Sequence, residues 1–391
     1  MKVFLIAGEA SGDALGGALM AGLRDLAPGV AFTGVGGPLM QARGLTSLFA
    51  MDELSIMGLA EVLPRYFALK RRIRQTADAI AAAAPDVVVT IDSPDFCLRV
   101  LALARASNPH LKTVHYVAPS VWAWRPGRAR KMAPLVDHVL ALLPFEVPYM
   151  TEAGMGCSFV GHPVVAQPQA SADEVAHFRA EIGVSGTDPL ILVLPGSRRG
   201  EVTRLLPVFE AALAPVLRDH PGARLVLPTT GNVTALVRQM TADWPVRPLI
   251  LDPQDESVDG FQSRKRAAFG AADVALAASG TVSLELAAAG TPMVIAYRMN
   301  RLTQALISRM LRVETVTLVN LVSQTRAVPE FIGNACIPAA ITAAVEEVLA
   351  SGPARKAQDV AMALTMDRLG LGGEAPGLRA ARAVLAVVGR G

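Results

Sequence analysis

The sequence predicts an α/β protein with two parallel-sheet domains in tandem. Short apolar runs alternate with alanine-rich helical stretches, which is typical of repeated strand–helix units. Hydrophobic residues make up 52% of the chain and aromatic residues only 5%, a balance that favours helices packed on buried parallel strands over a β-sandwich. The alternation stops between about residues 164 and 188, where Gln, Pro, Ser and Gly surround one short helix, and then restarts. This stretch is the expected linker.

The first domain is expected at residues 1–165, and a helix at about 370–391 is expected to pack back on it. Each strand of this domain is a short apolar run that ends in a Gly-, Ser- or Asp-containing loop. The strands are predicted at Lys2–Ala7, Ala31–Val35, Val87–Ile91, Thr113–Val117, His138–Ala141 and Ser158–Val160, with helices between them, for example at Ala14–Asp25 and Ile73–Ala84.

The second domain is expected at residues 185–350. Its predicted strands are Leu190–Leu194, Arg224–Pro228, Arg247–Leu251, Asp273–Ala277 and Met293–Tyr297. Open parallel sheets bind ligands outside the carboxyl ends of their strands. We therefore expect the two sheets to face each other across a cleft that holds the site.

Composition excludes several classes of function. The net charge of +3 is too small to indicate nucleic acid as a partner. The cysteines Cys97, Cys157 and Cys336 lie far apart, and the six histidines are scattered, so neither a disulfide framework nor a metal site is predicted. No apolar stretch is long enough to span a membrane, and Met1–Ala7 is too short for a secretory signal. The sequence predicts a soluble cytoplasmic protein without metal or cofactor, and it favours no oligomeric state.

The sharpest local signal is the run from Asp273 to Glu285, a strand followed by a tight Ser279-Gly280-Thr281 loop and a helix. Ser279 or Thr281 is suited to cap that helix, whose exposed N–H groups would bind a phosphate. Glu285 lies one helical turn beyond, where a carboxylate accepts ribose hydroxyls. An ordinary capped strand–helix unit has the same pattern.

A second loop, Gly196-Ser197-Arg198-Arg199, follows the first strand of the same domain. Arginine holds a phosphate through two parallel hydrogen bonds, and both loops open on the same edge of the predicted sheet. No GxxxxGK[ST] or GxGxxG pattern is present. The two loops together indicate a nucleotide diphosphate, held by Arg198 or Arg199.

The first domain offers a Gly-containing turn and a pair of carboxylates. The turn carries Glu9, Ser11, Gly12 and Asp13. Asp92 ends an apolar strand and faces the predicted cleft as a candidate general base. Asp95, the alternative base, follows Pro94 and is also placed to begin the next helix.

Aromatic and basic segments indicate sugar or lipid contacts. Trp122 and Trp124 lie beside Arg125, a grouping that suits a sugar, an acyl chain or a buried loop anchor. Two segments, 62–74 and 298–312, mix bulky apolar residues with cations, as membrane-surface helices do. The candidate lipid contacts in the first are Val62, Leu63, Tyr66, Phe67, Leu69 and Arg71. A helix packed on the core would show the same pattern.

Taken together, these motifs resemble lipid-A-disaccharide synthase, in that family's order and over nearly the whole chain. The most specific run is Pro119-Ser120-Val121-Trp122-Ala123-Trp124. The others are Gly8–Asp13, Met57-Gly58, Ile91–Phe96, Leu143–Glu146, Phe159–Pro163, Leu194–Arg198, Ala278–Thr281, and Asn320 with Val328-Pro329-Glu330.

The resemblance implies an inverting glycosyltransferase with two Rossmann-like domains, the GT-B architecture. It implies transfer of 2,3-diacylglucosamine from UDP-2,3-diacylglucosamine to 2,3-diacylglucosamine 1-phosphate through a β-1,6 link, with release of UDP. It also implies peripheral attachment to the cytoplasmic face of a Gram-negative inner membrane. The family's base falls on Asp92, its loop arginine on Arg198 and its asparagine on Asn320. Arg199 departs from the family pattern, which has a small residue there.

Two other classes of protein share parts of this pattern. A UDP-N-acetylglucosamine 2-epimerase has the same two-domain design and a ribose-binding glutamate, but needs no lipid. A non-catalytic two-lobed binding protein also places its ligand between α/β domains.

Overall fold

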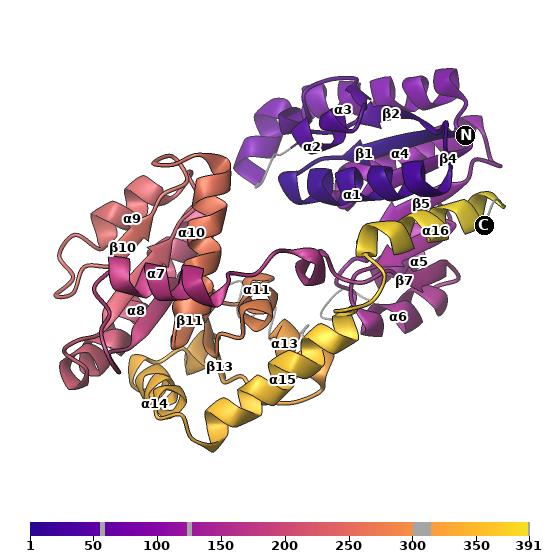
Figure 1. The fold of residues 1–391 in the computed structure, drawn as a ribbon. Helices are drawn as coiled ribbons and strands as arrows, with labels where there is room; N and C mark the ends of the chain where they lie inside the picture. The colour runs from indigo at the N-terminus through magenta and orange to yellow at the C-terminus, as the bar shows by residue number, and fades with distance from the viewer. Residues whose placement is uncertain (55–58, 123–126, 300–313, 390–391) are drawn as a thin grey trace. The chain divides into compact units, whose positions relative to one another are not determined.

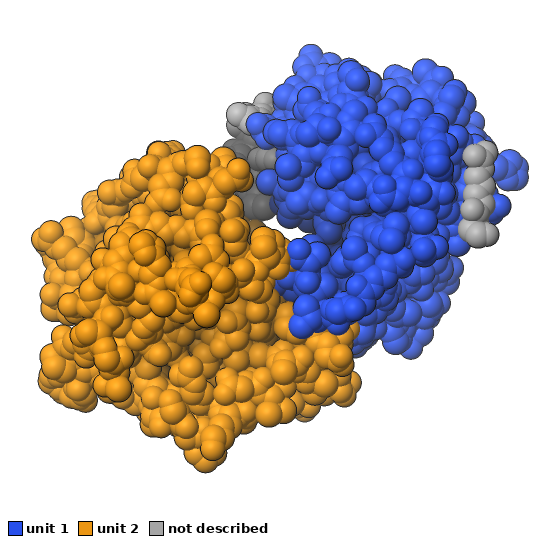
Figure 2. All heavy atoms as spheres, viewed as in Figure 1, with its two compact units in different colours: residues 1–166, 369–391 blue, residues 167–368 orange. Residues whose placement is uncertain are grey.

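The computed structural model describes residues 1–54, 59–122, 127–299 and 314–389, without the side chains of residues 59–66. The described chain forms two compact units, coloured separately in Figure 2. Unit 1 comprises residues 1–166 and 369–391, and unit 2 comprises residues 167–368. The chain therefore leaves unit 1 once and returns to it.

Unit 1 contains a seven-stranded, wholly parallel sheet in the order β3-β2-β1-β4-β5-β6-β7. The central strands are buried along their whole length because helices cover both faces, which is why their sequences are apolar throughout. The strands are β1 (Lys2–Ala7), β2 (Ala31–Val35), β3 (Thr46–Ser47), β4 (Val87–Ile91), β5 (Thr113–Tyr116), β6 (His138–Ala141) and β7 (Gly156–Phe159).

The helices of unit 1 form two layers (Figure 1). On one face, α1 and α16 pack together and bury Leu19 and Val384 against Leu5 and Val89 of the sheet. The other face carries α3 and α4. The helices are α1 (Ala10–Leu26), α2 (Pro38–Ala42), α3 (Leu59–Ala83), α4 (Pro94–Ser107), α5 (Gly127–Met132), α6 (Val147–Thr151) and α16 (Pro376–Val388), with 3-10 turns at Met51–Glu53, Pro144–Glu146 and Pro163–Ala166.

Small residues let α1 and α16 approach closely. A Cβ atom on Gly22 would lie 2.7 Å from the carbonyl oxygen of Gly377, and one on Gly377 would lie 2.7 Å from that of Ala18. Any larger side chain at either glycine would push the helices apart. The return of the chain to unit 1 thus completes a tightly packed helix pair.

Unit 2 contains a six-stranded parallel sheet in the order β10-β9-β8-β11-β12-β13. One face buries Phe209 of α8 and Val345 of α14 against the strands. The strands are β8 (Leu190–Leu194), β9 (Arg224–Pro228), β10 (Leu249–Leu251), β11 (Val274–Ala278), β12 (Met293–Tyr297) and β13 (Glu330–Ile332). The helices are α7 (Ala172–Glu181), α8 (Arg199–Asp219), α9 (Thr234–Met240), α10 (Val258–Ala271), α11 (Val282–Ala289), α13 (Leu318–Ser323), α14 (Pro338–Leu349) and α15 (Pro353–Leu369), with a 3-10 turn at Gly333–Ala335.

The strand order places the loops that matter. In each sheet the order reverses at the first strand, between β1 and β4 in unit 1 and between β8 and β11 in unit 2. Loops that leave neighbouring strands at such a reversal diverge to opposite faces and open a crevice at the carboxyl edge. The loops after β1 and β4 in unit 1, and those after β8 and β11 in unit 2, therefore lie where such crevices form.

The predicted fold class is confirmed: both sheets are parallel and covered by helices. The short strands β3 and β13 were not predicted, and α3 begins at Leu59 rather than near Ile73. The helix expected within the linker is α7, and it packs on α10 inside unit 2. Arg179 of α7 anchors it there, since its Nη1 lies 3.0 Å from Oδ2 of Asp273.

Candidate active site

In unit 2, the loops after β8 and β11 line one cavity of about 530 Å³. The structure thereby brings together most of the residues predicted for UDP: Gly196, Ser197, Arg198, Ser279, Gly280, Thr281 and Glu285. Further lining comes from the loop after β9 and from α10, including Pro228, Thr229, Thr230, Phe261, Gln262 and Lys265. Arg199 is the first residue of α8 and does not line this cavity within the described part of the chain.

Glu201 supports the loop after β8. Gly196 is in the left-handed region with φ +104°, and the Glu201 carboxylate occupies the space where a Cβ atom would stand. Oε2 of Glu201 accepts the backbone N–H of Arg198 at 3.3 Å, and Oε1 lies 3.3 Å from Nη1 of Arg198. Tyr297, at the end of β12, donates its hydroxyl to Oε1 at 3.3 Å. One carboxylate therefore fixes both the backbone and the side chain of Arg198.

The start of α11 differs from its prediction. Thr281 is the residue before the helix, but within the described residues its side chain makes no capping bond, and Ser279 lies too early to be the cap. Instead Ser283 donates its hydroxyl to the carbonyl of Gly280 at 2.9 Å. The N–H groups of Ser283 and Leu284 donate to the backbone carbonyls of Gly280 and Thr281, at 3.3 and 2.9 Å. A phosphate oxygen is therefore a suitable partner only for the N–H groups that precede them at the start of α11.

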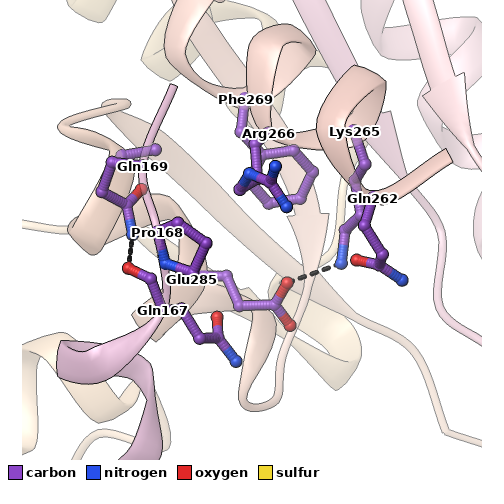
Figure 3. Close-up of a pocket in the computed structure, with 9 residues that line it drawn as sticks. Gln167, Pro168, Gln169, Gln262, Lys265, Arg266, Phe269 and Glu285 are labelled. Carbon is purple, nitrogen blue, oxygen red and sulfur yellow. Dashed lines mark hydrogen bonds and ion pairs between the residues drawn. The ribbon is translucent and has the colours of Figure 1, made fainter. Parts of the chain in front are cut away.

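Glu285 points toward α10. Its Oε2 accepts from Nζ of Lys265 at 2.6 Å, shown as a dashed line in Figure 3. The same Nζ lies 5.1 Å from the centre of the Phe269 ring. Lys265, Phe269 and Glu285 also line a second cavity of about 340 Å³, together with Gln167, Pro168, Gln169, Gln262, Arg266 and Ala289.

In unit 1, Asp92 and Ser93 follow β4 with left-handed backbones, at φ +51° and +43°. The Asp92 N–H donates to the carbonyl of Tyr116 at 2.9 Å, so the turn is fixed to the end of β5. Val117, the first residue after β5, also has a left-handed backbone, with φ +81°. Such angles are uncommon in residues other than glycine, and cluster at functional sites.

Asp95 lies in the first turn of α4, where its side chain is 94% exposed and pairs with Nη2 of Arg128 at 3.2 Å. Asp92 is half-buried and directly ends β4, at the reversal of strand order. Of the two candidate carboxylates, Asp92 is therefore the one that lies at the strand reversal itself.

The turn after β1 divides into exposed and buried residues. Glu9 precedes α1, and Ser11 is exposed on its first turn. Gly12 is buried, since a Cβ atom there would lie 3.5 Å from the carbonyl oxygen of Ile91. Asp13 is also buried, and its carboxylate accepts the backbone N–H groups of Gly37, Leu39 and Met40 at 2.9 to 3.0 Å. Asp13 therefore caps α2 and has its oxygens engaged there.

Trp122 is buried and donates Nε1 to Oε1 of Glu146 at 3.3 Å. Its ring also meets Phe145 edge to face, with ring centres 5.2 Å apart. Oε2 of Glu146 accepts the N–H of Leu143 at 3.0 Å. Burial raises the pKa of the Glu146 carboxyl to about 7, against the lowering effect of these hydrogen bonds. Trp124 and Arg125 lie outside the described residues.

Asn320 is buried in unit 2, and its amide pairs with Val328 in both directions. Nδ2 donates to the Val328 carbonyl at 2.8 Å, and Oδ1 accepts the Val328 N–H at 3.0 Å. This explains why an asparagine accompanies the Val-Pro-Glu element: its amide closes the turn between α13 and β13.

The segments predicted to meet lipid are described in part. Phe67 of α3 is 81% exposed, and Arg71 is exposed on the same helix. Leu69, predicted as a lipid contact, is instead half-buried and packs against the core of unit 1. The side chains of Val62, Leu63 and Tyr66 and the segment 300–313 lie outside the described residues. Among the helices that the structure describes, none is long and apolar enough to cross a membrane.

Three residues that sequence reasoning missed support the predicted ones: Glu146, Glu201 and Lys265. Glu146 and Glu201 each lie three residues after the residue preceding a helical turn and accept its N–H, a capping-box spacing that a search for this pattern would find. Lys265 carries no local signal, because its partner Glu285 lies 20 residues further along the chain.

Two parallel sheets, each with a reversal of strand order at its first strand, and a unit 2 cavity lined by loops suited to a diphosphate are the features of a two-domain nucleotide-sugar enzyme of the GT-B type. The family model described as lipid-A-disaccharide synthetase matches residues 3–372. The lipid-A-disaccharide synthase of Ruegeria pomeroyi is 62% identical over 385 residues, covering 98% of this chain and 95% of the relative. That of Rhodospirillum centenum is 46% identical over 389 residues, covering 99% and 95%. The chain belongs to the lipid-A-disaccharide synthase family and is a glycosyltransferase.

Solved structures confirm the fold. A UDP-N-acetylglucosamine 2-epimerase from Neisseria meningitidis, bound to UDP-GlcNAc, matches with a TM-score of 0.64 at 11% identity, covering 100% of both chains. The calicheamicin glycosyltransferase CalG4 matches with a TM-score of 0.55 at 17% identity, covering 100% of this chain and 98% of the other. These likenesses concern the fold alone, so they do not favour the epimerase alternative.

Proposed function

We propose that the enzyme transfers 2,3-diacylglucosamine from UDP-2,3-diacylglucosamine to 2,3-diacylglucosamine 1-phosphate with inversion. Asp92 takes the proton from the 6-hydroxyl of the acceptor, whose oxygen attacks the anomeric carbon from the face opposite UDP. The bond between that carbon and the diphosphate oxygen breaks, and UDP leaves. The observation that carries this role is the left-handed Asp92 at the strand reversal, where a carboxylate lies at the carboxyl edge of the sheet.

The leaving diphosphate develops negative charge, which unit 2 is built to stabilise. Arg198 lines the 530 Å³ cavity, and Glu201 fixes its position. The N–H groups at the start of α11 add the positive end of the helix dipole. Because Arg198 lines the cavity, we assign the diphosphate to it rather than to Arg199. Glu285 accepts the ribose hydroxyls.

The acceptor is proposed to meet the turns after β1 and β5. Ser11 and Gly12 lie at the start of α1, and Trp122 lies in the chain that follows β5. Asp13 and Asn320 act indirectly in this proposal, since their polar atoms are engaged by backbone groups.

Peripheral contact with the cytoplasmic face of the inner membrane is proposed through α3. Its exposed Phe67 lies beside Lys70, Arg71 and Arg74, which line a shallow surface pocket with it. Gln75 and Asp78 complete the lining. An exposed aromatic ring beside three cations suits the boundary between anionic head groups and acyl chains. The diacylated substrates reside in that boundary.

The decisive experiment mixes both acylated sugars with the enzyme and measures UDP release together with the disaccharide product. The wild type is expected to form both products, and to form no epimer from UDP-N-acetylglucosamine alone. Asp92→Asn is expected to abolish turnover while its calorimetric affinity for UDP stays within about twofold of the wild type. Asp95→Asn is the matched control and should lose less than about tenfold. Retained turnover in Asp92→Asn would disprove the assignment of the base.

A further inference from the structure

We propose that Lys265 is a positioning residue that holds the Glu285 carboxylate in place for the ribose. This inference rests on the proposed function, because it concerns how the nucleotide end of the site works. Lys265 projects from α10 and Glu285 from α11, and their side chains meet with Nζ 2.6 Å from Oε2. Figure 3 marks the contact between the two side chains with a dashed line.

Lys265 is itself held in place. Its Nζ lies 5.1 Å from the centre of the Phe269 ring, one helical turn along α10, a distance at which a cation is attracted to an aromatic face. The side chain is 26% exposed and that of Glu285 is 33% exposed, so the pair is largely withdrawn from solvent. Contacts on both sides of Nζ favour a fixed position over a mobile one.

The Lys265–Glu285 pair also lies where two cavities adjoin. Lys265, Phe269, Gln262 and Glu285 line both the 530 Å³ cavity with the diphosphate loops and the neighbouring 340 Å³ cavity. A carboxylate in a boundary of this kind could turn to either side. Its bond to Lys265 fixes which way the oxygens point.

Ribose recognition needs such control. Two neighbouring hydroxyls must both donate to one carboxylate, and a free glutamate would lose rotamer entropy on binding them. A carboxylate accepts about four hydrogen bonds, so one bond from Lys265 leaves room for two hydroxyls. Lys265 also offsets the negative charge that Glu285 would otherwise place beside a diphosphate.

A different role is direct contact between Lys265 and the phosphates, and ligand chemistry separates the two. UDP carries both ribose hydroxyls, whereas 2′,3′-dideoxyuridine diphosphate has the same base and phosphates without them. A residue that acts through Glu285 affects only the first ligand, while a residue that binds phosphate affects both.

The test is isothermal titration of both ligands into Lys265→Met, which keeps the aliphatic stem packed on Phe269 and removes the cation. Affinity for UDP is expected to fall about tenfold, affinity for the dideoxy ligand to change less than about twofold, and the melting temperature to stay unchanged. With the acylated substrates, KM for the UDP-sugar should rise about tenfold while kcat changes less than about threefold. Arg266→Met, which alters the neighbouring residue that lines only the smaller cavity, should change none of these quantities.

Equal weakening of both ligands in Lys265→Met would overturn the inference in favour of phosphate contact, and no weakening of either would also overturn it. Should that variant fail to fold, Lys265→Arg and Lys265→Gln replace it: the arginine is expected to keep the preference for UDP over the dideoxy ligand, and the glutamine to lose it. A wild type that binds both ligands equally would instead refute the ribose role of Glu285 in the proposed function. A wild type that binds neither would refute the nucleotide site itself.

Discussion

The turns that follow the strands of the two units use different residues at their left-handed backbone positions. After β4 and β5 in unit 1, the left-handed positions are taken by Asp92, Ser93 and Val117. After β8 in unit 2, the left-handed position is a glycine, Gly196. Left-handed backbone costs a residue with a Cβ atom about 1–2 kcal/mol and costs glycine almost nothing. Unit 1 therefore carries strain at a place where unit 2 avoids it.

The difference follows from what each edge presents. In the proposed function, unit 2 offers backbone N–H groups to a diphosphate, and glycine lets the backbone approach closely. Unit 1 would offer a carboxylate, so the residue in the turn must have a side chain. On this proposal, strain in unit 1 is the consequence of placing Asp92 in the turn, and it should be separable from activity by mutation.

The largest effect is expected for Asp92→Gly. Turnover should fall at least ~10³-fold because the proposed base is lost, while the free energy of unfolding in urea should stay equal or rise by about 1 kcal/mol because the strain is released. Asp92→Asn should lose as much activity without gaining stability. A clear loss of stability in Asp92→Gly would show that the left-handed turn carries no strain.

Next come the two arginines of the unit 2 loop. Arg198→Gln is expected to lower kcat about 100-fold, because a donor aimed at the leaving group is removed. Arg199→Gln should lower it less than about threefold, since Arg199 begins α8 outside the cavity lining. Steady-state release of UDP measures both. Equal losses would mean that the two arginines share the diphosphate.

Gly196→Ala tests whether unit 2 needs its glycine. The new Cβ atom would collide with the Glu201 carboxylate at a left-handed backbone angle, so affinity for UDP should fall about tenfold and stability by about 1–2 kcal/mol. Gly200→Ala is the matched control on the next turn of chain. There a Cβ atom meets only the flexible end of Arg204, at 3.2 Å, and both quantities should stay nearly unchanged.

The smallest effect is a pH dependence, and it concerns Glu146, which accepts hydrogen bonds from Trp122 and Leu143 in unit 1. Glu146 is buried in unit 1 with its pKa raised from 4.5 to about 7. The folded state therefore binds more protons than the unfolded state between these values, and this group's contribution to stability falls as pH rises. The stability advantage of the wild type over Glu146→Gln should shrink by on the order of 1 kcal/mol between pH 5 and 8, measured by urea unfolding. A constant difference would contradict the raised pKa.

Continuous apolar runs predicted the strands well, because buried parallel strands are apolar at every position. It missed β3, Thr46–Ser47, since two residues at an edge carry no periodic signal. The segment 62–74 was interpreted as an amphipathic helix separate from the helix at Ile73–Ala84, because Pro64 and the cations interrupt the apolar pattern, whereas α3 runs unbroken from Leu59 to Ala83. Local signals thus define the centre of each sheet better than its margins.

The positions of the candidate residues were predictable where one loop carries the signal. Strand ends predicted Asp92 and Arg198, since polar residues after an apolar run lie at the carboxyl edge. The capping role of Asp13 was not predictable, because its three N–H partners lie 24 to 27 residues away on another element. The hydrogen bond between Trp122 and Glu146 was not predictable for the same reason, since 24 residues separate the two.

The return of the chain to unit 1 has a consequence for biosynthesis. Residues 369–391 leave the ribosome only after all of residues 167–368, yet Ala380, Ala381, Val384 and Leu385 belong to the core beneath α1. Unit 2 has its full sequence available first, while unit 1 waits with an apolar face uncovered. A nascent chain stalled before residue 369 should therefore recruit chaperones through the uncovered face of α1, although the synthesis of unit 1 starts before that of unit 2.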